Sequence, residues 1–142
     1  MIGADGRIIH IDFGFILGTS PGGNLGFEKA AFKLTGEMVR LLDGVQSDLY
    51  RQFTDLTVQA FLIARTALPS ILTLLTPFIP STLACFVYGK DKVVRKVVDR
   101  LMPHLTPQAA AVAMQKLIEE ARHDWSTSIY DHVQWMQRRI RY

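Results

Sequence analysis

The spacing of apolar residues changes along the chain and predicts a short strand followed by helices. Residues 7–11 are rich in isoleucine and are bounded by the turn Asp5-Gly6 and by Asp12, which is typical of a strand. From residue 35 onward apolar residues recur at spacings of three and four, as they do in amphipathic helices. The pattern predicts a mainly α fold with one or two short strands and about six helices.

Capping residues and periodicity set the bounds of the longer helices. Thr35 caps a helix that stops at Asp43-Gly44, and a second helix spans residues 47–66. Further helices are expected at 91–102, at 106–123, where a Thr-Pro pair marks the start, and at 126–141. The predicted core face of the second helix consists of Leu49, Phe53, Leu56, Ala60 and Ile63.

Residues 66–89 carry no charge and are apolar enough to raise the question of a membrane span. Length alone would permit one, since a spanning helix needs about 20 apolar residues. However, Pro69, Pro77 and Pro80 divide the stretch into pieces that are too short to cross. We therefore expect two short helices that are buried in the core of the domain.

A glycine-rich loop, residues 12–33, separates the strand from the first helix. Loops longer than about 12–15 residues are uncommon and are usually functional or disordered. This loop starts at the end of a strand and contains several apolar side chains, which favours a functional loop. These apolar residues include Phe13, Phe15, Leu25 and Phe27.

Composition adds an uneven charge to this picture. The chain has 142 residues, which suits one globular domain, and a net charge of +3. Residues 1–89 hold 6 basic and 7 acidic side chains, whereas residues 90–142 hold 10 basic and 6 acidic ones. The cationic C-terminal part fits either an anionic partner or a solvated helix face. The single cysteine, Cys85, and the lack of a signal or transit peptide favour a reducing compartment.

The string His10-Ile11-Asp12-Phe13-Gly14 stands where the strand meets the loop. The strand delivers one carboxylate to the mouth of the loop, and apolar neighbours hold it in place. Phosphoryl transfer from ATP requires such a fixed carboxylate as a ligand for magnesium. Taken alone, the string is equally compatible with an Asp that only caps the end of the strand.

The sequence GRIIHIDFGFILGTSPGGNLGFEKAAFKLTGEMV, residues 6–39, resembles the activation segment of the phosphatidylinositol 3- and 4-kinase superfamily, and most closely that of the type III 4-kinases. In that group HIDFG is followed by Phe, an SP pair, NLGFE or NLGWE, and a KLT-type helix start. Here these are Phe15, Ser20-Pro21, residues 24–28 and residues 32–35. A weaker resemblance, with Trp135 in the last helix, extends to the C-terminus.

The resemblance implies that residues 1–142 are the distal C-lobe of an α+β kinase-like catalytic domain, with an activation segment at 12–34 and a helical part at 35–142. The implied cofactors are ATP and Mg²⁺: Asp12 would bind magnesium, and Ile11 would lie against the adenine. The segment 12–34, called the substrate loop below, would read the inositol headgroup. The candidate headgroup residues are Phe15, Ser20, Asn24, Leu25, Gly26, Lys29 and Lys33.

Two features of the substrate loop indicate which lipid is used. The 3-kinases usually place His directly after DFG, where this chain has Phe15. Between residues 12 and 34 the only basic residues are Lys29 and Lys33, whereas extra phosphates on inositol would require a cluster of charge-assisted bonds. The loop therefore favours plain phosphatidylinositol, unless the basic contacts come from elsewhere in the fold.

The C-terminal helix is the second candidate site. It combines aromatic rings with cations, a mixture that suits the headgroup level of a membrane. Packing of its apolar stripe on the domain is the alternative, and both can hold for different faces. The residues expected at the membrane are Trp135, Arg138, Arg139 and Arg141. The basic helix at 90–100 has no nucleic-acid reading motif beside it, so we expect no nucleic-acid partner.

A complete phosphotransferase site needs further parts that this sequence does not contain. It has no glycine-rich phosphate loop with a following Lys, and no DRHxxN string. We expect a cytoplasmic phosphatidylinositol 4-kinase that is peripheral on a membrane, with adaptor proteins as candidate partners. In the form of these 142 residues we expect it to be inactive and to expose apolar surface. Met1 is then a boundary within a longer enzyme. The alternatives are a non-catalytic fragment that binds membranes or partners, and a 3-kinase relative.

Overall fold

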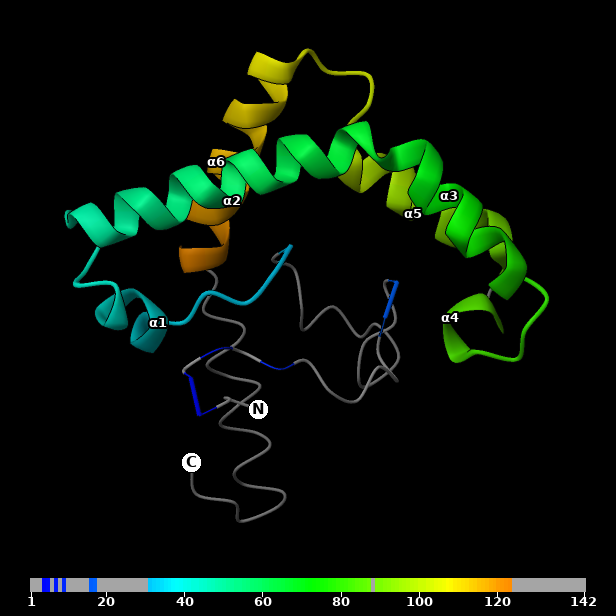
Figure 1. The fold of residues 1–142 in the computed structure, drawn as a ribbon, viewed down its shortest axis with the longest axis horizontal. Helices are drawn as coiled ribbons and strands as arrows, with labels where there is room; N and C mark the ends of the chain where they lie inside the picture. The colour runs from blue at the N-terminus through cyan, green and yellow to red at the C-terminus, as the bar shows by residue number, and fades with distance from the viewer. Residues whose placement is uncertain are drawn as a thin grey trace.

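The structure is a computed structural model that describes residues 4–5, 7, 9, 16–17, 31–87 and 89–123. These ranges contain six α-helices and one 3₁₀ helix, which confirms the mainly α class (Figure 1). The elements are α1 (Gly36–Leu41), α2 (Asp48–Thr66), α3 (Leu68–Leu75), η1 (Thr76–Phe78), α4 (Ala84–Val87), α5 (Lys90–Leu101) and α6 (Pro107–His123). The helix predicted at 126–141, and most of the strand predicted at 7–11, lie outside the described residues.

Both ends of α1 form as their residues predict. The Thr35 side chain accepts a hydrogen bond from the Met38 backbone N–H at 3.3 Å. At the other end Asp43 and Gly44 have φ angles of +59° and +84°, and the Gly44 N–H donates to the Val39 carbonyl at 3.0 Å. This turn satisfies carbonyls that the last turn of a helix leaves free. The predicted start and stop of this helix are therefore confirmed.

The helices predicted at 47–66, 91–102 and 106–123 also match α2, α5 and α6 to within one residue. The Ser47 side chain accepts from the Tyr50 N–H at 3.0 Å at the start of α2. The Thr106 side chain accepts from the Ala109 N–H at 3.2 Å at the start of α6. Proline at the first position of α6 fits because that N–H has no partner within the helix.

A bend of 65° separates α2 from the segment Leu68–Phe78. Pro69 has no N–H with which to continue the hydrogen bonds of α2, and the turn residue Ala67 donates to the Ala64 carbonyl instead. In the described part of the chain no single helix is long and apolar enough to cross a membrane. The two helices of this bent pair are long and apolar enough for a membrane span only when they are taken together, by length and composition alone.

Two apolar clusters hold the described helices together. In the first, α6 crosses α2, and the substrate loop ends between them (Figure 1). Its buried members are Leu34, Val58, Ile118 and Ala121. In the second, the start of α5 packs on α4 through Cys85, Phe86 and Val93. Helix α5 also runs beside α3 and contacts α2, so it connects the two clusters.

The predicted core face of α2 is wrong. Leu49, Leu56 and Ile63 are 46%, 57% and 70% exposed, whereas Val58 is buried against α6. Of the predicted face only Phe53 packs partly on the core. The reason is that α2 carries apolar residues on two sides, and the periodicity does not say which side α6 will cover.

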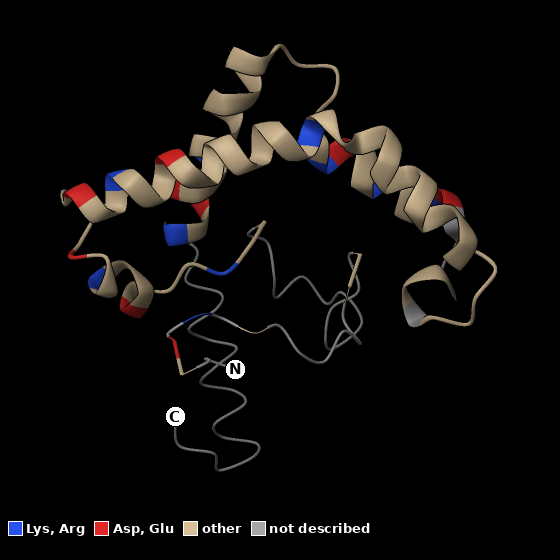
Figure 2. Cartoon of the chain, viewed as in Figure 1, with Lys and Arg blue, Asp and Glu red and all other residues tan. Residues whose placement is uncertain are grey.

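The stretch 66–89 forms two short α-helices, as predicted, but the expected burial is wrong for α3. No residue of α3 is buried, and Leu74 is 70% exposed, because the helix packs only on one side, against α2, η1 and α5. The residues of α4 behave as expected, since Cys85 and Phe86 are buried. Helix α3 carries no charged residue (Figure 2). Together with the exposed leucines and isoleucine of α2, it adds to the exposed apolar surface that the sequence predicted.

Candidate functional site

The structure describes both margins of the substrate loop, at residues 16–17 and 31–34. At the first margin Leu17 packs partly buried against the cluster of Cys85, Phe86 and Val93. Val93 belongs to the first turn of α5. The loop is thus attached by an apolar contact where α4 meets the start of α5.

The second margin is held by one polar and two apolar contacts. Arg100, in the last turn of α5, donates a hydrogen bond from Nη1 to the Ala31 carbonyl at 3.1 Å. Leu34 is only 5% exposed and lies in the cluster between α2 and α6, against which Phe32 also packs. The loop therefore ends at a defined place before Thr35 caps α1.

Both margins depend on the same helix. Val93 and Arg100 are seven residues apart, so their backbone positions are separated by about 10 Å along the axis of α5. Residues three and four apart on a helix share a side. Lys96 follows Val93 by three residues and precedes Arg100 by four, so the two attachment points share one side of α5. This rigid helix fixes the distance between the two margins of the loop.

Arg65 of α2 determines where α5 ends. Its guanidinium donates to the carbonyls of Leu101 at 2.9 Å, Met102 at 3.0 Å and Leu105 at 2.7 Å. The last carbonyls of a helix have no partner within the helix, and the negative end of the helix dipole there also attracts a cation. Met102 caps α5 in the left-handed conformation, with φ of +48°. One half-buried side chain thus ties α2 to α5 and to the turn before α6.

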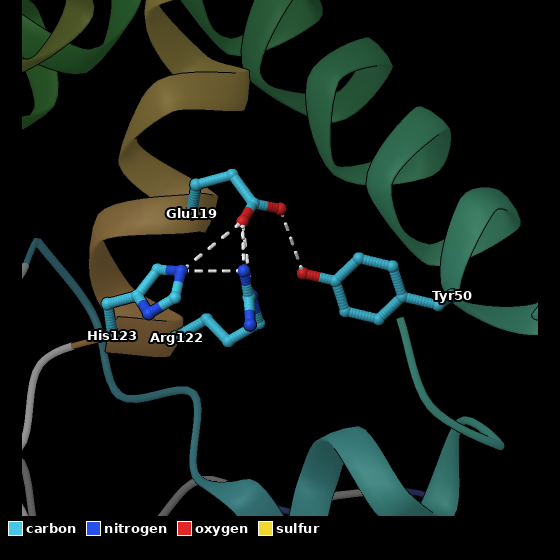
Figure 3. Close-up of polar contacts among 4 residues, drawn as sticks. All are labelled: Tyr50, Glu119, Arg122 and His123. Carbon is cyan, nitrogen blue, oxygen red and sulfur yellow. Dashed lines mark hydrogen bonds and ion pairs between the residues drawn. The ribbon is translucent and has the colours of Figure 1, made fainter. Parts of the chain in front are cut away.

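A second polar cluster joins the start of α2 to the end of α6 (Figure 3). The Tyr50 hydroxyl donates to Glu119 Oε1 at 3.4 Å, and Arg122 Nη2 donates to Glu119 Oε2 at 2.7 Å. His123 Nε2 lies 4.0 Å from the same carboxylate. Burial, and after it the negative charge of Glu119, raise the pKa of Tyr50, so its hydroxyl stays a donor to higher pH than that of a free tyrosine. The cluster is a structural tie between α2 and α6.

The predicted site residues fall mostly outside the described part of the chain. Lys33 is described and exposed, two residues after the Ala31 carbonyl that Arg100 binds. The others lie outside the described residues: Ile11, Asp12, Phe15, Ser20, Asn24, Leu25, Gly26, Lys29, Trp135, Arg138, Arg139 and Arg141. Among the described side chains no three His, Cys, Asp or Glu residues are grouped to hold a metal ion.

Sequence reasoning missed Arg100, which holds the second loop margin, and Arg65, which holds the end of α5. The partners of Arg65 lie 36 to 40 residues away along the chain, and the partner of Arg100 lies 69 residues away. No local motif predicts such contacts. The burial of Leu34 could have been predicted, because it is an apolar residue directly before the cap Thr35. Its burial follows from its place between the loop and the core.

The mainly α fold is consistent with a kinase C-lobe fragment. A family model described as "Phosphatidylinositol 3- and 4-kinase" matches residues 1–88. Because the match covers more than half of the chain, the chain belongs to the phosphatidylinositol 3- and 4-kinase family, as the sequence motifs indicated.

Curated relatives match nearly the whole chain. It is 40% identical to phosphatidylinositol 4-kinase alpha 2 and 41% identical to phosphatidylinositol 4-kinase alpha 1 of Arabidopsis thaliana, over 138 residues and 95% of the chain in each case. It is 33% identical to phosphatidylinositol 4-kinase beta of Danio rerio over 141 residues, or 99% of the chain. The chain spans 26%, 7% and 16% of the lengths of these three relatives.

Proposed function

We propose that the chain is the distal part of the catalytic domain of a phosphatidylinositol 4-kinase. The complete domain transfers the γ-phosphoryl group of ATP to the 4-hydroxyl of phosphatidylinositol, giving phosphatidylinositol 4-phosphate and ADP. The observation that carries the proposal is the similarity to named phosphatidylinositol 4-kinases over 95–99% of the chain. The attachment of both loop margins to α5 supports it, because a headgroup loop must be held in a defined place.

The roles of individual residues follow from the DFG string and the loop. Asp12 holds Mg²⁺, and Ile11 lies against the adenine of ATP. Phe15 and the low positive charge of the loop favour plain phosphatidylinositol over its phosphorylated forms, with Lys29 and Lys33 as the basic residues of the loop. The remaining loop contacts to the headgroup come from Ser20, Asn24, Leu25 and Gly26.

The enzyme works at a membrane surface in this proposal. It is peripheral on the cytosolic face of an intracellular or plasma membrane, where Trp135 and the arginines at 138, 139 and 141 contact the headgroups. Adaptor proteins are candidate partners. The 142 residues alone are inactive, because neither a glycine-rich phosphate loop nor a DRHxxN string is among them.

A chimera tests the activity directly. The segment of Arabidopsis phosphatidylinositol 4-kinase alpha 2 that matches this chain is replaced by residues 1–142, and phosphate transfer to phosphatidylinositol vesicles is measured. We expect the 4-phosphate as product, little transfer to phosphatidylinositol 4-phosphate, and loss of activity in the matched control Asp12→Asn. The 142-residue chain alone should transfer no phosphate.

Other results would favour the alternatives. A 3-phosphate product would make the chain a 3-kinase relative. A folded chimera that binds vesicles but transfers no phosphate would support a non-catalytic binding fragment. Activity of the isolated chain would show that the proposed dependence on the missing parts is wrong.

A further inference from the structure

Helix α5 has two contrasting sides. Its apolar side faces α2, α3 and α4, with Val93 buried and its other apolar residues half-buried. The rest of its surface, which begins next to Val93, is exposed and charged, and the basic residues there outnumber the acidic ones. The exposed residues are Asp91, Lys92, Arg95, Lys96, Asp99 and Arg100.

The charges of α5 are sorted into two rows. Residues four apart lie next to each other along one side of a helix. Asp91, Arg95 and Asp99 form a row of alternating sign, in which the acidic residues flank the arginine. The neighbouring row, Lys92, Lys96 and Arg100, is entirely basic and extends over about 12 Å. This row is called the basic row below.

The basic row lies on the side of α5 that holds the substrate loop. Arg100 at its end binds the Ala31 carbonyl, and Lys96 is three residues after Val93, a member of the cluster against which Leu17 packs. Both margins of the loop therefore meet α5 beside this row.

We propose that the basic row docks the protein on an anionic phospholipid bilayer, with the two loop margins at the level of the headgroups. The inference rests on the proposed function, because it concerns how the substrate loop reaches a lipid in a membrane. Charge complementarity selects the occupant: basic residues near an anionic leaflet are attracted to it, and this row has three of them in line. The row adds a second contact to the one expected from the C-terminal helix.

Vesicle co-sedimentation of the 142-residue chain tests the docking. The vesicles are pure phosphatidylcholine, or phosphatidylcholine with about one fifth phosphatidylserine to set an anionic surface. The test variant is Lys92→Ala with Lys96→Ala, which leaves Arg100 in place. The control is Arg51→Ala with Lys116→Ala, which removes the same charge from exposed ion pairs on α2 and α6. Circular dichroism confirms that both variants keep the helix content of the wild type.

The expected result is specific to the row and to anionic lipid. Each lysine near an anionic surface contributes about a fivefold factor in partitioning, so the test variant should bind the anionic vesicles about 25-fold more weakly. The control should stay within about threefold of the wild type. Equal partitioning of the two variants would overturn the proposal. So would binding of an oligonucleotide that is lost in the test variant while vesicle binding is unchanged.

The docking and the proposed activity can fail separately. A chimera without kinase activity leaves the vesicle result intact, and then only the proposed function is wrong. If the chimera phosphorylates phosphatidylinositol and Lys92→Ala with Lys96→Ala changes neither vesicle binding nor the rate on anionic vesicles, the docking is wrong and the activity stands. If Lys92→Ala with Lys96→Ala lowers the rate of the chimera on anionic vesicles but not in detergent micelles, the result supports both the docking and the activity.

Discussion

Replacing Arg65 by Met tests whether one side chain connects α2 to the end of α5. The change keeps a long side chain and removes the three hydrogen bonds to the carbonyls of residues 101, 102 and 105. A hydrogen bond from a charged donor contributes about 1.5–3 kcal/mol, but water can reach a half-buried site and replace part of this. We therefore expect a loss of about 3 kcal/mol in the free energy of unfolding, which lowers the melting temperature by about 6–12 °C.

The matched control is Arg51→Met on the same helix. Arg51 is exposed, pairs with Asp48 and donates to the Gln46 carbonyl at 3.1 Å. Exposed ion pairs contribute about 0–1 kcal/mol, so this variant should unfold close to the wild type. Urea unfolding followed by circular dichroism measures both variants. A difference of less than about 0.5 kcal/mol between the two would refute the role assigned to Arg65.

Two further outcomes follow from single contacts. Arg100→Met removes the hydrogen bond to the Ala31 carbonyl, so tryptic cleavage after Lys33 should accelerate about tenfold. The control Arg95→Met should leave the cleavage rate unchanged. Equal cleavage rates in the two variants would contradict this prediction. The raised pKa of Tyr50 means that folding favours the protonated phenol, so this stabilisation is complete below about pH 10 and is lost as the pH rises through the folded pKa. Urea unfolding above about pH 9 should therefore lose stability more steeply in the wild type than in Tyr50→Phe, and parallel profiles would show that Tyr50 does not titrate this way.

The sequence predicted where helices begin and end better than which faces they bury. Thr35, Asp43 and Gly44 act through bonds within a few residues, so local sequence is sufficient to place them. Which face of α2 is buried depends instead on where α6 packs, and α6 lies about 50 residues further along the chain. Leu56 and Val58 are both apolar, and only the tertiary packing makes the first exposed and the second buried.

The same distinction between local and tertiary determinants applies to the candidate site. The DFG string and the loop composition indicated the chemistry, because magnesium binding and headgroup selectivity depend on residue types in a short segment. The support of the loop was not predicted, since Arg100 and Ala31 are 69 residues apart. Asp12 and the other residues outside the described part of the chain remain predictions from motif and resemblance.

Helix α5 explains how a glycine-rich loop can present a defined surface. Closing a chain segment of about 13 residues costs about 2 kcal/mol in chain entropy, and glycines in the sequence add to the freedom that is lost. Leu17 on the α4–α5 cluster and the Arg100 bond to Ala31 offset that cost at the margins. Because α5 sets the span, substitutions at Arg65 should alter the loop without touching it. The same helix carries the basic row, so in the proposed docking one rigid element would couple the position of the loop margins to the approach to a bilayer.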